Sequence, residues 1–144
     1  MVELNTISLQ LGRQKLQMGF SNYDSRSDAV DVIMKMEYDP SLALNTIESE
    51  PFYMSRQELT RFACYLNEIS VNDSTAAEFP YVPTNLGFEL TWFDNDTYDL
   101  TVELFIKIGE ADDGREYAGY RGQAKSEDVL IFSDQLNRVN ANLC

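Results

Sequence analysis

Apolar residues at every second position are the feature that most constrains how this chain folds. They alternate with polar residues from position 30 to 38 and again from 98 to 108. A period of two is typical of a β-strand that buries one side and exposes the other. The same pattern runs through Ile7–Leu11 and Leu16–Phe20, with Gly12 between them. We therefore predict that the first third of the chain consists of strands and begins with a hairpin.

After Ser55 the apolar spacing changes to three and four residues, which indicates a helix. Ser55 and Glu58 carry the signature of a capping box, in which each side chain accepts a hydrogen bond from a backbone N–H of the first turn. The apolar stripe of this helix consists of Leu59, Phe62, Leu66 and Ile69. Cys64 falls on the opposite side of the helix, so we expect its thiol to be exposed.

A second helix is predicted from Ser126 toward the end of the chain. Ser126 is a favoured N-cap residue, and Glu127 and Asp128 place negative charge in the first turn, where the helix dipole favours it. The apolar stripe of this helix consists of Val129, Phe132, Leu136, Val139 and Leu143. Neither helix can bury its stripe alone, so we expect both to pack on a sheet.

The alternation around the turn at 94–96 also predicts a strand register. Directly opposed residues of an antiparallel pair share a face, and a slip by one residue would expose the whole apolar set. The pairing that keeps apolar residues together sets Trp92 opposite Leu100, Leu90 opposite Val102 and Phe88 opposite Leu104. The same register sets Glu89 directly opposite Glu103.

Together these patterns predict an α+β fold. We expect a mainly antiparallel sheet of about seven strands, with two amphipathic helices packed on it, in a single domain spanning residues 1–144. The remaining segments are predicted as a weak strand over 42–52, a loop over 71–83, a loop over 109–114 and a short strand over 115–125. The predicted core includes Trp92, Leu100, Val102, Leu104, Phe62, Leu66, Phe132 and Leu136.

The residue content argues against an enzyme. The chain has no histidine, which removes the usual general base near neutral pH and the commonest zinc ligand. Asp94, Asp96 and Asp99 have the spacing of a calcium loop, but Tyr98 occupies a position where that loop needs a different residue, so we interpret the segment as a turn. We expect no cofactor and no metal. Carboxylate-based catalysis stays open as the less favoured alternative.

Charge restricts the class of partner. The formal net charge is −13, which repels nucleic acid and anionic membranes at long range and attracts basic proteins. Residues 89–116 contain nine acidic and two basic residues, for a local balance of −7. Acids interleaved with aromatic residues are typical of a docking surface for a basic protein, although a solvated face is the simpler interpretation. The predicted partner-binding residues are Glu89, Phe93, Asp99, Glu103 and Phe105.

Three segments together resemble the WapI-like immunity proteins of bacteria. The first is the leucine-rich helix over 55–69, and the second is the stretch Phe79–Phe88 with its Pro83 and Asn85-Leu86. The third is the alternating strand over 100–108 with Glu103 near its middle, followed by an amphipathic helix. The resemblance implies a cytoplasmic protein that neutralises a basic toxin domain by binding it, and it implies no catalytic residues.

Two further observations bear on location and assembly. No apolar run approaches the length of about 20 residues that spans a bilayer, and the N-terminal residues lack the pattern of a signal peptide. Cys64 and Cys144 are expected to be free thiols in a reducing compartment, so we expect a cytoplasmic protein with no membrane contact. A structural or regulatory protein that binds copies of itself, for example as a homodimer, is the main alternative to a toxin-binding module.

Overall fold

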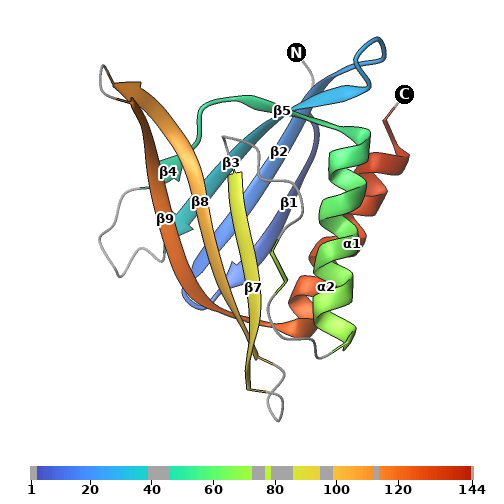
Figure 1. The fold of residues 1–144 in the computed structure, drawn as a ribbon. Coiled ribbons are helices and arrows are strands. Elements are labelled where there is room, and N and C mark those ends of the chain that lie inside the picture. The colour runs from blue at the N-terminus through green and yellow to red at the C-terminus, as the bar shows by residue number, and fades with distance from the viewer. Residues whose placement is uncertain are drawn as a thin grey trace.

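The computed structural model has the predicted α+β class, with antiparallel strands and two helices. The structure describes residues 3–38, 46–72, 77–78, 86–94, 99–111 and 114–143. The strands form two separate sheets, and Figure 1 shows the two helices side by side along one flank of the molecule.

The first sheet contains the predicted hairpin and the strand that follows it. Gly12, at the hairpin turn, has a φ of +60°, a conformation that glycine adopts without the steric cost that other residues meet. Two short strands pair with the outer edge of the third strand, one near each end. The members of this sheet are β1 (Glu3–Leu11), β2 (Gln14–Asp24), β3 (Ala29–Tyr38), β4 (Ile47–Glu48) and β5 (Phe52–Ser55).

The second sheet confirms the predicted register. Trp92 lies opposite Leu100, Leu90 opposite Val102, and Phe88 opposite Leu104. The order of its strands along the sheet follows the order along the chain. They are β6 (Ala77–Glu78), β7 (Leu86–Asp94), β8 (Asp99–Ala111) and β9 (Gly114–Lys125).

The arrangement of the strands differs from the prediction of one sheet of about seven. Because β4 and β5 already pair with the free edge of β3, the strands after the first helix cannot extend the first sheet there and form a second sheet. The predicted loop over 71–83 contains the last helical turn and β6, and the predicted loop over 109–114 contains paired ends of β8 and β9. Backbone pairing continues past Ile108, where the alternating pattern ends, and the side-chain pattern alone does not reveal this.

The helices are α1 (Arg56–Asn72) and α2 (Ser126–Ala141). The predicted capping box of α1 is confirmed: the Glu58 N–H donates to Ser55 Oγ at 3.1 Å, and the Ser55 N–H donates to Glu58 Oε1 at 3.2 Å. The predicted N-cap of α2 is wrong by one residue. Lys125 occupies the cap position without a side-chain cap bond, because β9 runs directly into the helix and the buried Ser126 is already helical.

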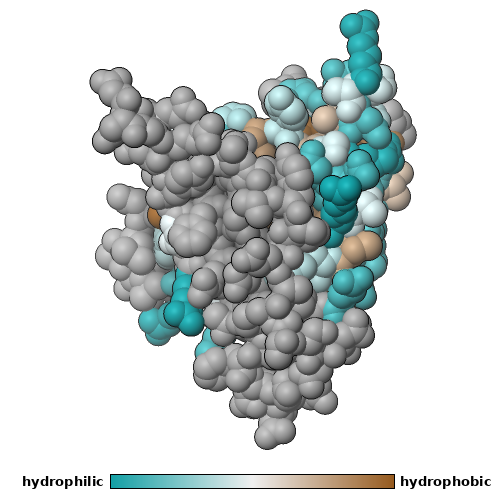
Figure 2. Space-filling view, in the orientation of Figure 1, coloured by the Kyte–Doolittle hydropathy of each residue, from teal (hydrophilic) through white to brown (hydrophobic). Residues whose placement is uncertain are grey.

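The core lies between the first sheet and the two helices. Phe62, Leu66, Phe132 and Leu136 are fully buried, as predicted. The other four predicted core residues lie in β7 and β8, where the structure describes the backbone but not their side chains. Cys64 is exposed as predicted, whereas Cys144 lies outside the described residues. The outer surface of the helices is mostly hydrophilic (Figure 2).

Candidate functional site

The predicted partner-binding residues lie on two neighbouring strands of the second sheet. Glu89 on β7 is directly opposite Glu103 on β8, as the sequence predicts, and Phe105 is opposite Gly87. Phe93 falls where the β7–β8 register shifts, between Trp92 and Asp94. A bulge at this point interrupts strict alternation, so the pattern no longer fixes the face on which Phe93 lies.

The structure adds a third glutamate, in a segment that the sequence pattern predicts as a loop. Glu78 on β6 is directly opposite Glu89, which is itself opposite Glu103. We call Glu78, Glu89 and Glu103 the glutamate row. Neighbouring strands lie about 4.8 Å apart, so the row places three acidic residues at consecutive positions across the sheet. Like charges directly opposite each other across a ladder are destabilising.

The fourth strand limits the extent of this acidic surface. Arg121 on β9 lies opposite Glu103, and Lys125 lies opposite Asp99. Both basic residues are exposed. Residues 117–125 add these two basic residues and no acid, so the balance of residues 89–125 is −5. The register therefore places Arg121 at the Glu103 end of the row, on the side away from β6 and β7.

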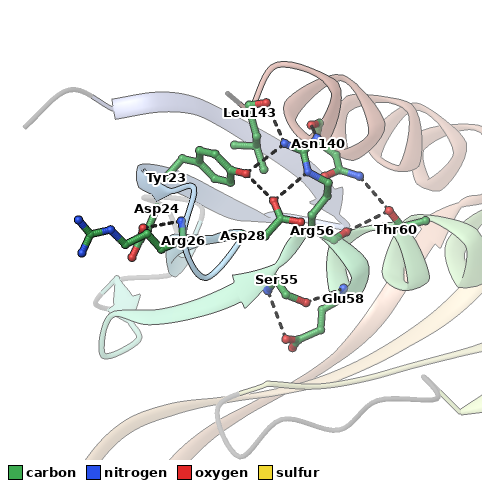
Figure 3. A network of polar contacts seen from close by, with 10 residues as sticks. All are labelled: Tyr23, Asp24, Arg26, Asp28, Ser55, Arg56, Glu58, Thr60, Asn140 and Leu143. Atoms are coloured by element: carbon green, nitrogen blue, oxygen red, sulfur yellow. Dashed lines mark hydrogen bonds and ion pairs between the residues drawn. The ribbon is translucent and has the colours of Figure 1, made fainter.

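A second polar cluster joins four distant parts of the chain (Figure 3). Arg56, at the start of α1, donates from Nε to Asp28 Oδ1 at 3.1 Å and from Nη2 to the Tyr23 hydroxyl at 3.4 Å. It also donates from Nη1 to the Asn140 carbonyl at 2.9 Å and from Nη2 to the Leu143 carbonyl at 2.8 Å. The Asn140 carbonyl lies in the last turn of α2, where a cation is favoured, and the Leu143 carbonyl lies just beyond the helix. We call these five residues the Arg56 network.

Two residues around the turn between β2 and β3 have an uncommon backbone conformation. Asn22, near the end of β2, and Asp28, in the turn, have φ values of 53° and 52°, in the left-handed region that non-glycine residues seldom occupy. The Tyr23 hydroxyl donates to the Asp28 carboxylate, and this hydrogen bond, followed by the one from Arg56, lowers the pKa of Asp28. Each group in the network has a partner, so the arrangement acts as a brace between β2, β3, α1 and α2.

Hollows in the surface of the described residues include the following two. One, of about 360 Å³, lies on the face of the first sheet that points away from the core, around Gly19. The other, of about 220 Å³, lies between α1 and α2 beside Ile131, one of the few exposed large apolar residues.

The described part of the chain offers no metal site built from side chains. No three Cys, Asp or Glu residues there come together as possible ligands of one ion. Neither of the two helices in this part is long and apolar enough to cross a membrane.

Comparison with known proteins identifies a fold but no family. No family model matches the chain. No curated protein matches it in sequence. The plant transcriptional regulator PBF-2 has a similar structure, with a TM-score of 0.54 and 15% identity over 99% of this chain and 83% of that one. MRP1/MRP2 of Trypanosoma brucei is also similar, with a TM-score of 0.50 and 9% identity over 94% of this chain and 81% of that one. At these identities the likeness shows the fold alone.

Proposed function

We propose that this chain is a non-enzymatic binding module whose partner is a basic protein, docked on the second sheet along the glutamate row. The observation that carries the proposal is the direct opposition of Glu78, Glu89 and Glu103 across three strands. The net charge of −13 steers a basic partner toward the molecule at long range. The resemblance to WapI-like immunity proteins suggests a basic toxin domain as that partner.

The glutamate row has a physical cost that a partner would remove. Each pair of like charges directly opposed on a sheet destabilises the free protein by roughly 0.2–1 kcal/mol. Lysine or arginine side chains of a partner would pair with these carboxylates and relieve the repulsion. Natural proteins often give up stability at working sites, which makes a costly arrangement of this kind a reasonable position for an interface.

The lack of histidine supports binding in preference to catalysis. Catalysis by carboxylates alone requires two acids with clearly different pKa values in a secluded site. Asp28 is the carboxylate whose pKa is clearly shifted among those whose side chains the structure describes, and it is exposed and already bonded to Arg56 and Tyr23.

The experiment compares two double variants that change net charge equally. E89Q/E103Q removes two charges from the glutamate row, whereas E48Q/E68Q removes two exposed charges from β4 and α1. Wild type and both variants serve as bait in extracts of the native cell, and the basic protein that is captured is then purified and titrated at several salt concentrations. We expect E89Q/E103Q to weaken binding by about tenfold or more at low salt, as expected for loss of a close charge pair. We expect the control variant to bind like wild type.

The same variant should move the stability of the free protein in the opposite direction. E89Q/E103Q removes two like-charge pairs and also the favourable pair of Glu103 with Arg121. The net rise in its free energy of unfolding is therefore expected to be small, about 0.2–1 kcal/mol. Equal loss of binding in both double variants would show that the partner responds to the net charge of the molecule and not to the glutamate row. Wild-type affinity in E89Q/E103Q would refute the proposed docking surface.

A further inference from the structure

The hollow around Gly19 lies on an open sheet face with a distinct chemical lining. Leu16, Met18 and Phe20 of β2 are completely buried, so the residues between them lie on the opposite, outer face. Gly19 is flanked there by its register partners, Thr6 on β1 and Ile33 on β3. The residues on this face that line the hollow are Thr6, Gln17, Gly19, Ser21, Ile33 and Lys35. Its volume of about 360 Å³ falls within the usual range for small-ligand sites, roughly 300–1,000 Å³.

Backbone geometry does not account for glycine at position 19. Among the described glycines, only Gly12 has a positive φ, and Gly19 itself is paired with both neighbouring strands, next to the point where the β1–β2 register shifts. Glycine within a strand weakens it and often marks a bulge or a close approach by a ligand or another backbone. The missing side chain is what opens the floor of the hollow.

The lining selects an uncharged ligand with both polar and apolar parts. Lys35 carries the positive charge of the lining, and Glu37 lies 3.6 Å from its ammonium group and offsets that charge. An anion therefore gains little there, and the net charge of −13 opposes it further. A purely apolar ligand would remove water from the hydroxyl and amide groups of the wall without replacing their hydrogen bonds.

A sugar residue meets these requirements. Its hydroxyl groups match the polar wall, and its apolar ring face matches the floor formed by Gly19 and the half-buried Ile33. Tyr53 on β5 lies on the same face, opposite Asp31 and therefore diagonal to Ile33. It is 74% exposed, the highest value among the large apolar and aromatic residues that the structure describes. Diagonal neighbours lie about 7–8 Å apart, so an aromatic platform stands beside the Ile33 edge of the hollow.

We propose that this face of the first sheet binds an uncharged glycan, with one sugar residue in the hollow over Gly19 and the next against Tyr53. This site is separate from the glutamate row, so failure of one proposal would not contradict the other. The negative charge of the chain argues against a second copy as occupant, because two such molecules repel each other.

The test is an NMR titration of the labelled protein with maltose, cellobiose and N,N′-diacetylchitobiose, each compared with its monosaccharide. We expect at least one disaccharide to shift the amide signals of Thr6, Gly19 and Ile33. Filling the hollow with Gly19→Val should weaken this binding about tenfold or more, because the pocket cannot enlarge to admit both groups. Ser8→Val, on the same face but outside the hollow, should leave it unchanged. Tyr53→Ala should weaken the disaccharide and leave the monosaccharide unaffected.

The stability of the Gly19 variant provides a second readout. Valine suits a strand better than glycine, so Gly19→Val should raise the melting temperature by about 2–4 °C. Loss of folding in this variant, or a lower melting temperature in both it and Gly19→Ala, would show that glycine serves the fold and would overturn the proposal. Absence of shifts with all three disaccharides, shifts scattered away from the hollow, or wild-type affinity in Gly19→Val would overturn it as well.

Discussion

The packing of α1 against α2 depends on two aromatic rings. Phe62 and Phe132 are both fully buried, with ring centroids 6.3 Å apart and ring planes at 80°. This edge-to-face arrangement lies within the favourable range of centroid separations, about 4.5–7 Å. Replacing Phe62 by alanine is therefore expected to lower the free energy of unfolding by about 3–5 kcal/mol, the usual cost of removing a buried ring.

A double-mutant cycle separates the ring–ring interaction from simple burial. Phe62→Leu and Phe132→Leu keep an apolar side chain in each position and remove the aromatic contact. Edge-to-face pairs contribute about 0.5–1.5 kcal/mol beyond the area they bury. Phe132→Leu should therefore lower the free energy of unfolding by that much less in the Phe62→Leu variant than in the wild type. The free energy of unfolding is measured by urea denaturation of the wild type, both single variants and the double variant.

The result of the cycle decides whether these helices are held by a specific contact. A coupling energy below about 0.3 kcal/mol, within the usual error of additivity, would refute the inferred ring interaction. Ile131→Ala provides the control on the same helix. Its side chain is 56% exposed, so the substitution should change the free energy of unfolding by less than about 0.5 kcal/mol.

Three further predictions concern the capping box, the Arg56 network and the hairpin. Ser55→Ala should cost about 1 kcal/mol in a urea melt, whereas Glu58→Gln, which can still accept the Ser55 N–H, should be nearly neutral. The pKa of Asp28 is lowered in the folded state, so its stabilising effect is present above the ordinary pKa of 3.8 and is lost as pH falls through the folded-state pKa. Asp28→Asn should therefore lower the melting temperature at neutral pH, and its difference from wild type should disappear in strong acid; a difference independent of pH would contradict this. Gly12→Ala should cost about 1–2 kcal/mol in a urea melt because of the positive φ, and an unchanged midpoint would show that the turn adapts.

Features that depend on near neighbours in the sequence were predictable. The hairpin around Gly12, the capping box of α1 and the register of β7 with β8 all follow from residues that are close along the chain. In each case one arrangement keeps the apolar residues together or satisfies backbone N–H groups, and every alternative exposes them. Local patterns of this kind therefore restrict the chain to few alternative structures.

Features that depend on distant segments were not predictable in this way. Arg56 is separated by more than eighty residues from the α2 carbonyls to which it donates, and nothing in its local sequence indicates them. The division into two sheets and the pairing of β4 and β5 with the β3 edge depend on segments far apart in the chain, and only the folded chain reveals them. The partners of β9 were missed because glycines and polar residues occupy most of its positions and obscure its register.

Only those parts of the candidate site that lie on strands with a clear apolar pattern could be predicted. The opposition of Glu89 and Glu103 follows from the apolar register of their two strands, and the structure confirms it. Glu78 was missed because β6 has two residues, too few for any alternation. Arg121 was missed because the side-chain pattern of β9 does not fix its register with β8, although this residue bounds the acidic surface.

The two charged clusters of this molecule differ in a way that separates folding from binding. In the Arg56 network, the acid has a base 3.1 Å away and the base also satisfies two carbonyls at a helix end, so every charge lowers the energy of the folded chain. In the glutamate row, Arg121 lies opposite the last of the three acids, while Glu89 stands between two others. Like charges opposed in this way are expected to lower the stability of the free protein, so folding alone gives no reason to retain them. The basic partner proposed above would supply that reason, because its charges would meet the carboxylates of acids that lie opposite other acids.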